Sequence, residues 1–493
     1  MLRTSSRRRA LRAALLTALQ IAARSASAGL PPEDSCPTIS GMPGAGGGIA
    51  EDAIPARLRE GMLLSYNDVL LLTTLLPVEV WRNREQFFHD GMRLEVGPCH
   101  RRYAAPEFFD AATRRFAGQA RTDKDGNLEN HTAGVPFPPD SIDPKAPDAA
   151  LRWAWNFERR YRGAGQMGSF RLVDMPSEVG GIQTYEGDWF WLQTRHRADL
   201  PDSDYALPDV APAEWVAGGT FKEPQSARFL AWRQIRPLDV ALHYSRPDDT
   251  FVYVPTMRKS RRAASAWVDG LYMPRYRVSG DFGGGGIPIG GAGAYGGGAV
   301  NPTAGESIAV TENLRRGFTG LSLRPNAYDW RMLDEREVLA PINTTRSGYP
   351  EDRERNFGPS GLSLGNDRWD VRYAVVIQGV LKERGRDYDL LTLWIDYQTQ
   401  QPLYVMTRRK TGAGQQLLEV GVLAHRYSGD LSRYPDWPDG KKASVFDPVA
   451  EVFFDSADGR SGWRRESYDV KSVPPPVAEL RRLTEPSYLE HGR

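Results

Sequence analysis

The segment 388–427 decides the fold class, and it reads YDLLTLWIDYQTQQPLYVMTRRKTGAGQQLLEVGVLAHRY. Its apolar residues recur at every second position, which is typical of β-strands. Two short turns interrupt the pattern, at 398–401 and at 411–414, and both contain the polar or glycine residues that turns favour. The segment therefore predicts three antiparallel strands joined by hairpins.

Both faces of this predicted meander are apolar. One face carries Leu391, Leu393 and Ile395, and the other carries Leu390 and Trp394. A sheet that is apolar on both sides must be covered on both sides or must curve around something apolar. Further strands with the same period are expected at 371–381, 188–192, 229–235 and 250–254.

Helices are expected mainly before the strands. Pro77 suits the first turn of a helix that ends before Gly91, and a second helix is expected over 106–117. The segment 151–161 fits a helix or a strand, and its pattern leaves that choice open.

The first 28 residues have the pattern of an export signal. Five arginines precede an Ala/Leu-rich run at 13–23, and Ala26-Ser27-Ala28 matches the small residues that precede signal-peptidase cleavage. A membrane span needs about twenty apolar residues, so this shorter run predicts a leader that is cleaved near Ala28. We therefore expect a periplasmic protein whose contact with a membrane is transient at most.

Loss of the leader changes the net charge. The chain has 63 basic and 62 acidic residues, and the leader contains six arginines and no acid, so 57 basic and 62 acidic residues remain. Nucleic-acid-binding proteins are usually strongly basic, and a nucleic-acid partner is not expected. The two cysteines, Cys36 and Cys99, are expected to pair in an oxidising compartment, with two unrelated thiols as the alternative.

Composition divides the chain into parts. A Pro/Gly-rich stretch without periodicity follows the leader and predicts a flexible arm. A glycine-dense stretch is expected as a surface insertion or as a flap at a cavity mouth. The expected parts are a signal peptide (1–28), the arm (29–55), a helical and loop region that packs on the sheet (56–150), the sheet itself (151–470) with its glycine-rich insertion (280–305), and a C-terminal tail (471–493).

Six short segments resemble those of one family of exported bacterial proteins. They are GVPFPP (134–139), WNFERRY (155–161), RPDDTFVYVP (246–255), YDW (328–330), EVLAP (337–341) and IDYQT (395–399). Over about residues 60–430 the chain thereby resembles the DUF1329 family, which is grouped with the LolA-like lipoprotein-carrier superfamily.

The resemblance implies a fold and a function. The implied fold is mainly β, a large curved antiparallel sheet in the form of a LolA-like half-barrel with helices covering its concave, apolar side. Folds of that superfamily hold acyl chains or other hydrophobic cargo, so the resemblance implies a carrier or chaperone without a catalytic group or a cofactor. It also implies an RND-type transporter and an outer-membrane protein as partners.

Aromatic residues on the predicted strands are the candidates for contact with an apolar ligand. Large flat side chains cover much apolar area with few rotors to freeze, and core packing is the alternative role for each of them. The candidates are Trp189, Trp191, Tyr253, Trp267, Tyr373, Trp394 and Tyr404.

A basic cluster is the candidate for contact with a charged head group. Arg258, Arg261 and Arg262 follow the strand predicted at 250–254, and a guanidinium group can bind a phosphate or a carboxylate with two hydrogen bonds. A solvated end of a strand is the alternative.

Other motifs predict less. The histidines show no ligand spacing, so no metal site is expected. In 123–127 the glycine stands fourth, whereas a calcium-binding EF-hand loop needs it sixth, and a hairpin turn is expected instead. Gly291, Gly293 and Gly296 have a dinucleotide-binding spacing, but glycine-dense sequence produces that match by composition alone.

Two other functions stay open. An exported hydrolase of lipid or polysaccharide would use carboxylates such as Asp188 or Asp396, brought to catalytic separation by the fold. An envelope scaffold would show a large exposed apolar patch. A deep apolar cavity without converging ionisable groups would favour the carrier.

Overall fold

The structure is a computed structural model, and most of the chain after residue 55 is described by it. The expected signal peptide and Trp267 lie outside the described residues, as does most of the glycine-rich insertion. The described residues are 30–39, 56–175, 182–200, 204–255, 258–262, 275–278, 299–300, 307–311, 322–344, 357–383, 388–428, 445–456, 462–471 and 477–491.

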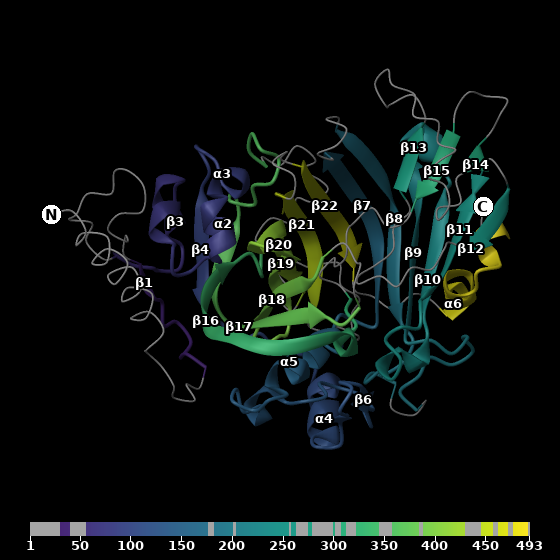
Figure 1. Ribbon diagram of the computed structural model, residues 1–493, viewed down its shortest axis with the longest axis horizontal. Coiled ribbons are helices and arrows are strands. Elements are labelled where there is room, and N and C mark those ends of the chain that lie inside the picture. Colours follow the sequence, from purple (N-terminus) through teal and green to yellow (C-terminus); the bar gives the residue numbers. More distant parts are fainter. Residues whose placement is uncertain are drawn as a thin grey trace.

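A single curved sheet of 15 strands organises the molecule (Figure 1). Its strands run in the order β12-β11-β10-β9-β8-β7-β22-β21-β20-β19-β18-β17-β4-β3. Strand β16 lies outside this order and pairs with the edge of β17 opposite to β18 and β4. The strands are β3 (Leu63–Leu64), β4 (Leu94–Cys99), β7 (Gly165–Met175), β8 (Gln183–Gln193), β9 (Trp215–Glu223), β10 (Ala231–Arg236), β11 (Asp249–Val254), β12 (Lys259–Arg262), β16 (Tyr328–Ala340), β17 (Arg368–Leu381), β18 (Leu390–Asp396), β19 (Pro402–Thr411), β20 (Gly414–Tyr427), β21 (Phe446–Asp455) and β22 (Gly462–Lys471).

Smaller elements surround this sheet. Three small sheets are formed by β1 (Thr38–Ile39) with β2 (Ala56–Arg57), by β5 (Arg121–Thr122) with β6 (Leu128–Glu129), and by β13 (Arg275–Val278), β15 (Ser307–Thr311) and β14 (Ala299–Val300). The α-helices are α2 (Val78–Arg82), α3 (Arg84–Phe87), α4 (Glu107–Phe116), α5 (Ala149–Glu158), α6 (Val477–Thr484) and α7 (Tyr488–His491). The short 3-10 helices are η1 (Asn67–Leu71), η2 (Pro139–Ser141), η4 (Gln225–Ala227), η5 (Leu238–Ala241) and η7 (Pro325–Ala327).

The predicted meander is confirmed as β18, β19 and β20. Trp394 pairs with Tyr404, and Tyr404 pairs with Val422, so the apolar periods of the three strands are in register. All pairs in the large sheet are antiparallel except the pairing of β17 with β4. The fold class is therefore mainly β with a large curved sheet, as predicted.

Two strands that are far apart in sequence, β7 and β22, join the two halves of the sheet. Strand β22 pairs with β7 from Trp463 opposite Met175 to Lys471 opposite Met167. The hydroxyl of Ser467 donates to the carbonyl of Arg171, 296 residues away in sequence. No local pattern encodes this contact, which places β7–β12 beside β16–β22.

The segment that the sequence left open is the helix α5. Its side chains Trp153 and Phe157 pack in one core with Ile377, Leu393 and Phe453 of the sheet. We call the side of the sheet that carries these residues the α5 face. The local pattern of this segment fits both a helix and a strand. Its apolar contacts with the sheet therefore decide that it forms a helix.

The opposite side of the sheet, which we call the N-terminal face, is covered by residues before β4. Val80, Phe87 and Phe88 pack in one core with sheet residues such as Trp394 and Tyr404. The single helix predicted after Pro77 is wrong in one respect, because it is divided into α2 and α3 at Asn83. The Asn83 side chain donates to the carbonyl of Glu79 at 2.8 Å, which is the local bonding by which asparagine competes with helix continuation.

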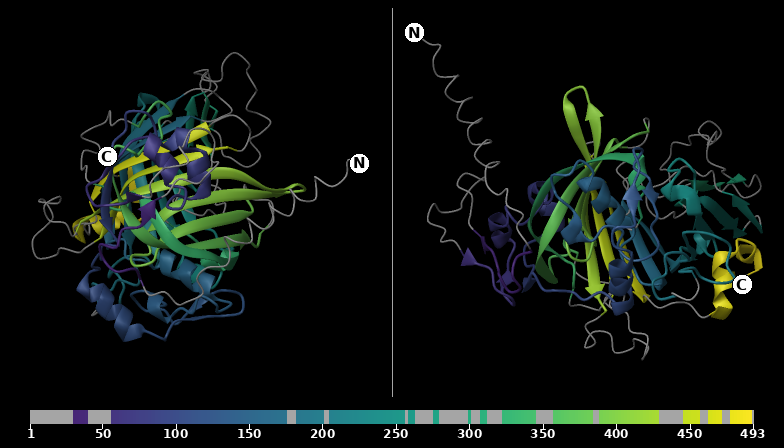
Figure 2. Two further views of the ribbon diagram at one scale, coloured as in Figure 1. Left: turned by 90° about the vertical axis from the view of Figure 1, so that its left-hand side faces the viewer. Right: turned by 90° about the horizontal axis from the view of Figure 1, so that it is seen from below.

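The expected arm and tail are both partly packed. Residues 30–39 are not a free arm, because Cys36 forms a disulfide with Cys99, β1 pairs with β2, and Ile39 is buried. In the tail, Leu480 and Leu483 of α6 pack against Phe190, on the side of β8 opposite Trp189. Helices α6 and α7 (yellow) lie at the end of the sheet opposite the N-terminal helices (purple) in Figure 2.

Candidate functional site

The α5 face continues beyond α5 onto the other half of the sheet. Leu423, Glu451, Glu466 and Leu172 lie directly opposite one another on β20, β21, β22 and β7, and residues directly opposite in neighbouring strands share a face. Leu423 belongs to the core under α5 and Leu172 to a different apolar cluster. One face of the sheet therefore carries two apolar regions side by side.

We call the second region the aromatic surface. Its fifteen buried apolar residues come only from β7–β11, β22 and the turn at η4, and no α-helix among the described residues contributes to it. The core under α5, in contrast, is a contact between a sheet and a helix. The residues of the aromatic surface are Phe170, Leu172, Tyr185, Trp189, Trp191, Trp215, Ala217, Phe221, Ala227, Leu230, Trp232, Val252, Val254, Tyr468 and Val470.

Glycines make room for the rings of this surface. Gly219 lies opposite both Trp189 and Trp232, and a Cβ atom at Gly219 would lie 2.5 Å from the Trp232 ring. A Cβ atom at Gly187 would lie 2.7 Å from the Phe170 ring. Both contacts are too close for any other residue, so these glycines leave the space that the two rings occupy.

Buried charged residues separate the two apolar regions, and we call them the polar belt. The Arg464 guanidinium lies 4.5 Å from the Phe453 ring and 3.0 Å from a carboxylate oxygen of Glu466. The Tyr468 hydroxyl donates to the other oxygen of Glu466. The polar belt consists of Glu158, Arg160, Arg162, Glu451, Arg464 and Glu466.

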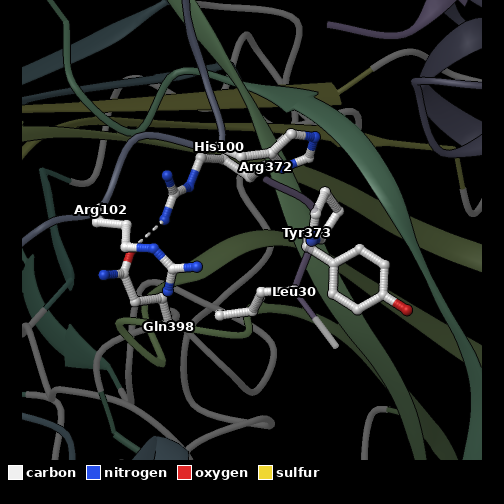
Figure 3. Close-up of a pocket in the computed structure, with 7 residues that line it drawn as sticks. Leu30, His100, Arg102, Arg372, Tyr373 and Gln398 are labelled. Atoms are coloured by element: carbon white, nitrogen blue, oxygen red, sulfur yellow. Dashed lines mark hydrogen bonds between the residues drawn. The ribbon is translucent and has the colours of Figure 1, made fainter. Parts of the chain in front are cut away.

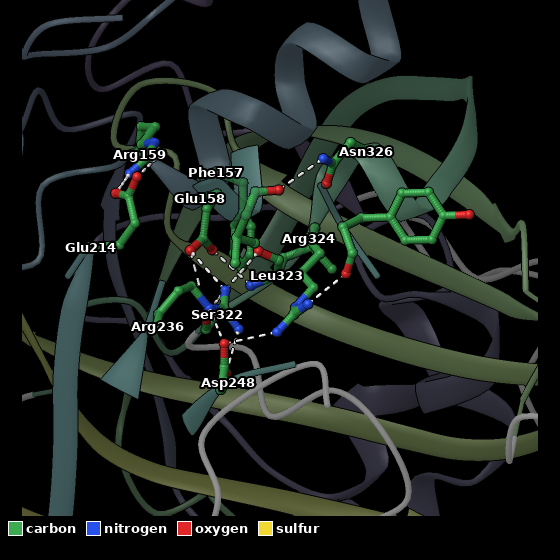
Figure 4. A network of polar contacts seen from close by, with 12 residues as sticks. Phe157, Glu158, Arg159, Glu214, Arg236, Asp248, Ser322, Leu323, Arg324 and Asn326 are labelled. Atoms are coloured by element: carbon green, nitrogen blue, oxygen red, sulfur yellow. Dashed lines mark hydrogen bonds and ion pairs between the residues drawn. The ribbon is translucent and has the colours of Figure 1, made fainter. Parts of the chain in front are cut away.

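An ion-pair network connects the end of α5 to the strands β10 and β11 (Figure 4). Arg236 lies 3.5 Å from Glu158 and 3.2 Å from Asp248, and Arg324 lies 2.8 Å from Asp248. Burial alone would raise the pKa of Asp248, but Arg236 and Arg324 hold it below its usual value. Since all four side chains are buried, removal of one would leave its partners without compensation.

Two histidines that are distant in sequence meet beside this network. The rings of His131 and His196 have centroids 4.6 Å apart, and His196 lies 3.4 Å from Glu214. Arg159 donates to Glu214 at 2.5 Å. Burial lowers the pKa of His131 well below its ordinary value, and the neighbouring His196 lowers it further. Sequence spacing did not indicate this pair, because the contact joins two separate loops.

Two tryptophans of the aromatic surface lie next to the network. The Arg162 guanidinium lies 4.3 Å from the centre of the Trp191 ring, and the Arg236 guanidinium lies 4.6 Å from that of Trp215. Trp215 was not among the predicted ligand residues. Its position at the start of a strand that runs from Trp215 to Glu223, with two glycines inside it, was the available signal.

The structure distributes the predicted aromatic residues over several regions. Trp189 and Trp191 lie in the aromatic surface, whereas Tyr253 packs against Leu489 of α7 on the other side of the sheet. Trp394 and Tyr404 lie in the core of the N-terminal face. The alternation along a strand indicates which residues share a face but not what covers that face. A ligand role for Tyr253, Trp394 or Tyr404 is therefore not supported by their positions, and such a role for Trp189 and Trp191 stays a prediction.

Tyr373, the remaining described candidate, borders a small pocket (Figure 3). His100, Arg372 and Gln398 line the same pocket, whose volume of about 10 Å³ is room for roughly one water molecule. Arg372 binds Asp396 at 2.7 and 3.2 Å and Gln398 at 3.1 Å. This pocket is too small for an amphiphile.

The predicted basic cluster lies on the last strand of the sheet, β12. Arg261 and Arg262 are exposed, and Arg262 forms an ion pair with Asp249. The backbone N–H of Ser260 donates to Glu490 of α7 at 2.8 Å, which partly covers the free edge of the sheet. A head-group role for Arg258, Arg261 and Arg262 stays a prediction.

The two carboxylates of the hydrolase hypothesis do not converge. Asp188 is exposed on β8 and forms an ion pair with Lys222 at 2.6 Å, whereas Asp396 is buried on β18 and bound by Arg372. Five strands of the sheet separate β8 from β18. The exposed large apolar residues of the described chain are scattered over different elements, as single residues commonly are.

The described residues provide further limits on the site. They contain no group of three or more His, Cys, Asp or Glu side chains placed to hold a metal ion. Within the same ranges, no helix has the length and hydropathy needed to cross a membrane. A polar surface pocket of about 490 Å³, lined by Lys124, Asp125, His243, Tyr244 and Lys382 among others, lies beside the β5–β6 hairpin. That hairpin confirms the turn predicted at 123–127.

Comparison with known proteins identifies the family that the sequence resembles. Residues 85–277 match the family described as a protein of unknown function, DUF1329. The predicted resemblance is thereby confirmed over this range, which is shorter than the range of about 60–430 that the motifs suggested. No curated protein matches the chain.

Three solved structures are similar to the chain at low sequence identity. A DUF1329 family protein from Desulfovibrio piger has a TM-score of 0.40 and 10% identity, and the match covers 70% of this chain and 99% of that one. A putative outer membrane lipoprotein-sorting protein domain from Vibrio parahaemolyticus has a TM-score of 0.38 and 11% identity. That match covers 70% of this chain and 100% of the other. A LolA superfamily protein from Nitrosomonas europaea has a TM-score of 0.31 and 12% identity. That match covers 68% of this chain and 96% of the other. These similarities are too distant to transfer a ligand or an activity.

Proposed function

We propose that the protein is a non-enzymatic carrier or chaperone for a hydrophobic or amphiphilic cargo, and that the cargo lies against the aromatic surface. The observation that carries this proposal is the composition of that surface. Fifteen buried apolar residues gather on one face, and none of them belongs to a described α-helix. A curved aromatic region of this kind suits an apolar ligand, because rings bury much area at low entropic cost.

The energetics favour a long hydrocarbon chain as the cargo. Each buried methylene contributes about 0.8 kcal/mol, so one acyl chain can provide affinity without any catalytic group. The adjacent polar belt and ion-pair network would meet the polar end of an amphiphile, since buried charged groups interact strongly in a low dielectric. A fatty acid or a lipid acyl chain fits both regions.

The place of action in this proposal is the periplasm. The basic leader with its Ala26-Ser27-Ala28 site supports export, and the Cys36–Cys99 disulfide suits an oxidising compartment. Transfer of cargo across the envelope would require membrane partners, and we propose an RND-type transporter and an outer-membrane protein for this role on the family resemblance alone.

Binding of the cargo can be tested on protein purified from the envelope. Native mass spectrometry should detect a lipid that co-purifies, and a fluorescent fatty acid should bind and be displaced by oleic acid. Trp189→Ala should weaken binding roughly 10-fold or more, because it removes a central ring of the surface. Phe190→Ala is the matched control, since Phe190 is the next residue and packs under α6 on the other face.

Two results would contradict the carrier function. One is a protein that contains no lipid and binds no amphiphile in the displacement assay. The other is equal loss of affinity in Trp189→Ala and in Phe190→Ala, with both variants folded by circular dichroism, because the ligand would then not distinguish the two faces.

A further inference from the structure

The aromatic surface contains two hydrogen-bond donors for which the described chain provides no acceptor. The indole nitrogens of Trp191 and Trp215 are buried, each residue is 2% exposed, and neither N–H has a hydrogen-bond partner. A buried donor without an acceptor costs roughly 1–3 kcal/mol. Buried indole N–H groups usually have a partner, so these two indicate that something other than the described chain supplies an acceptor.

The two donors are neighbours on the same face. Trp191 lies opposite Ala217, and Trp215 lies opposite Gln193 on the same pair of strands. The two tryptophans are therefore diagonal neighbours, a relation that places their backbones about 7–8 Å apart and their rings within reach of one another. Both donors therefore belong to the same pair of strands and to the same apolar cluster.

Charges nearby favour an acceptor that carries negative charge. Arg162 lies over the Trp191 ring at 4.3 Å and Arg236 over the Trp215 ring at 4.6 Å. A cation over an indole withdraws electron density from it and makes its N–H a stronger donor. The carboxylate of Glu158 lies 3.8 Å from Arg162 and 3.5 Å from Arg236 and partly neutralises both.

We propose that the indole N–H groups of Trp191 and Trp215 bind an oxygen of an acyl head group, either a carboxylate or an ester carbonyl, whose hydrocarbon chain lies along the aromatic surface. The proposal rests on the carrier function and adds to it the class of the head group and its position. It places the head group at the α5 end of the surface, away from the Arg258–Arg262 cluster on the last strand.

Three probes with the same chain length test the head group. Oleic acid carries a carboxylate, methyl oleate carries an ester carbonyl, and 1-octadecene carries no oxygen. The double variant Trp191→Phe/Trp215→Phe keeps aromatic rings but removes both donors. It should bind oleic acid and methyl oleate about 10-fold more weakly for each donor lost, whereas its affinity for 1-octadecene should change far less.

The matched control is Trp232→Phe, which removes similar ring area from the same surface, and the indole nitrogen of Trp232 is not among the buried donors without a partner. This control should reduce the affinity for all three probes alike. Stronger binding of oleic acid than of methyl oleate by the wild type would assign a carboxylate, and equal binding would assign a carbonyl.

A second measurement does not depend on the variants being folded. The indole resonances of Trp191 and Trp215 in a ¹⁵N–¹H spectrum of the wild type should move downfield when oleic acid binds and should respond less to 1-octadecene. If oleic acid binds while neither resonance moves and the double variant keeps its affinity, the head-group site is wrong and the carrier function stands. If none of the three probes binds the wild type, both proposals fail.

Discussion

The two apolar regions of the α5 face differ in what covers them. Trp153 and Phe157 of α5 close the first region, and its core contains residues of a helix and of a sheet. The aromatic surface contains residues of its own strands and of the η4 turn. Both regions consist of alternating apolar residues on neighbouring strands, so a strand pattern does not indicate whether a helix will cover the face.

The polar belt explains why the two regions do not merge into one core. Glu451, Arg464 and Glu466 lie on β21 and β22, between Phe453 and Tyr468. Buried charges rarely stabilise a fold better than apolar residues of similar size. Their position at the border between a closed core and the aromatic surface fits the proposed cargo site, where a polar end of the ligand needs partners.

The largest expected effect compares one tryptophan from each region. Trp153→Ala should lower the free energy of unfolding by about 4 kcal/mol, because it opens a cavity between a helix and a sheet. Trp189→Ala should cost about half as much, since the apolar cluster of Trp189 contains no residue of a described helix. Chemical denaturation monitored by circular dichroism measures both values, and equal losses would show that the aromatic surface is packed as tightly as the closed core.

The ion-pair network provides a second comparison. Asp248→Ala should cost about 3 kcal/mol, because it leaves Arg236 and Arg324 buried without their shared carboxylate. Asp249→Ala is the control, because Asp249 forms only an exposed ion pair with Arg262. This substitution should cost less than about 1 kcal/mol. Similar losses in the two variants would contradict a role of the network in holding β10 and β11 to α5.

Ligand binding should stabilise the aromatic surface selectively. Oleic acid at 100 times its dissociation constant should raise the free energy of unfolding of the wild type by about 2.7 kcal/mol. At the same concentration Trp189→Ala should gain clearly less, whereas Phe190→Ala should gain as much as the wild type. Thermal unfolding with and without oleic acid measures this difference, and an equal gain in all three proteins would place the ligand elsewhere.

The last prediction concerns pH and the buried His425. Burial, with Arg160 nearby, lowers the pKa of His425 to about 3 from an ordinary 6.5. Between these values the unfolded chain binds a proton that the folded protein excludes, so His425 contributes stability that rises with pH by about 1.4 kcal/mol per pH unit and is lost as pH falls. Above pH 6.5 this contribution is constant.

Asp370 acts in the opposite direction over part of this range. Burial raises the pKa of Asp370 to about 6, so its contribution falls as pH rises from about 4 to 6. The test is therefore the difference in slope between the wild type and His425→Gln in denaturation at pH 4.5 to 6.5. The exposed His243→Gln is the control, and a slope unchanged by His425→Gln would contradict a buried neutral imidazole.

Local patterns predicted most of the elements. The period of two gave β17–β20 with correct turns, and Pro106 with Gly118 gave the limits of α4 within a residue. The predicted helix after Pro77 was divided because the Asn83 side chain bonds the backbone of Glu79. The segment of α5 stayed ambiguous, since a helix buried on most sides has apolar residues all round.

The candidate site could be predicted only in part. Trp189 and Trp191 were among the predicted residues because they are aromatic and lie on one strand, and both lie in the aromatic surface. Tyr253 and Trp394 are also aromatic residues on predicted strands, but Tyr253 packs against α7 and Trp394 packs in the core of the N-terminal face. Trp215, Arg162 and Arg236 were missed, because their meeting depends on the pairing of β9 with β10 and on where α5 ends.

The sequence alone determined the apolar alternation, the export signal pattern, the pairing potential of two cysteines and the family resemblance, all of which are properties of residue type and local spacing. Only the tertiary structure decided that β22 pairs with β7, which face each aromatic residue occupies and which charges meet in the polar belt. The physical reason is that a strand has two equivalent faces until a neighbouring strand and a covering layer are placed. Contacts between residues hundreds of positions apart carry no local signal.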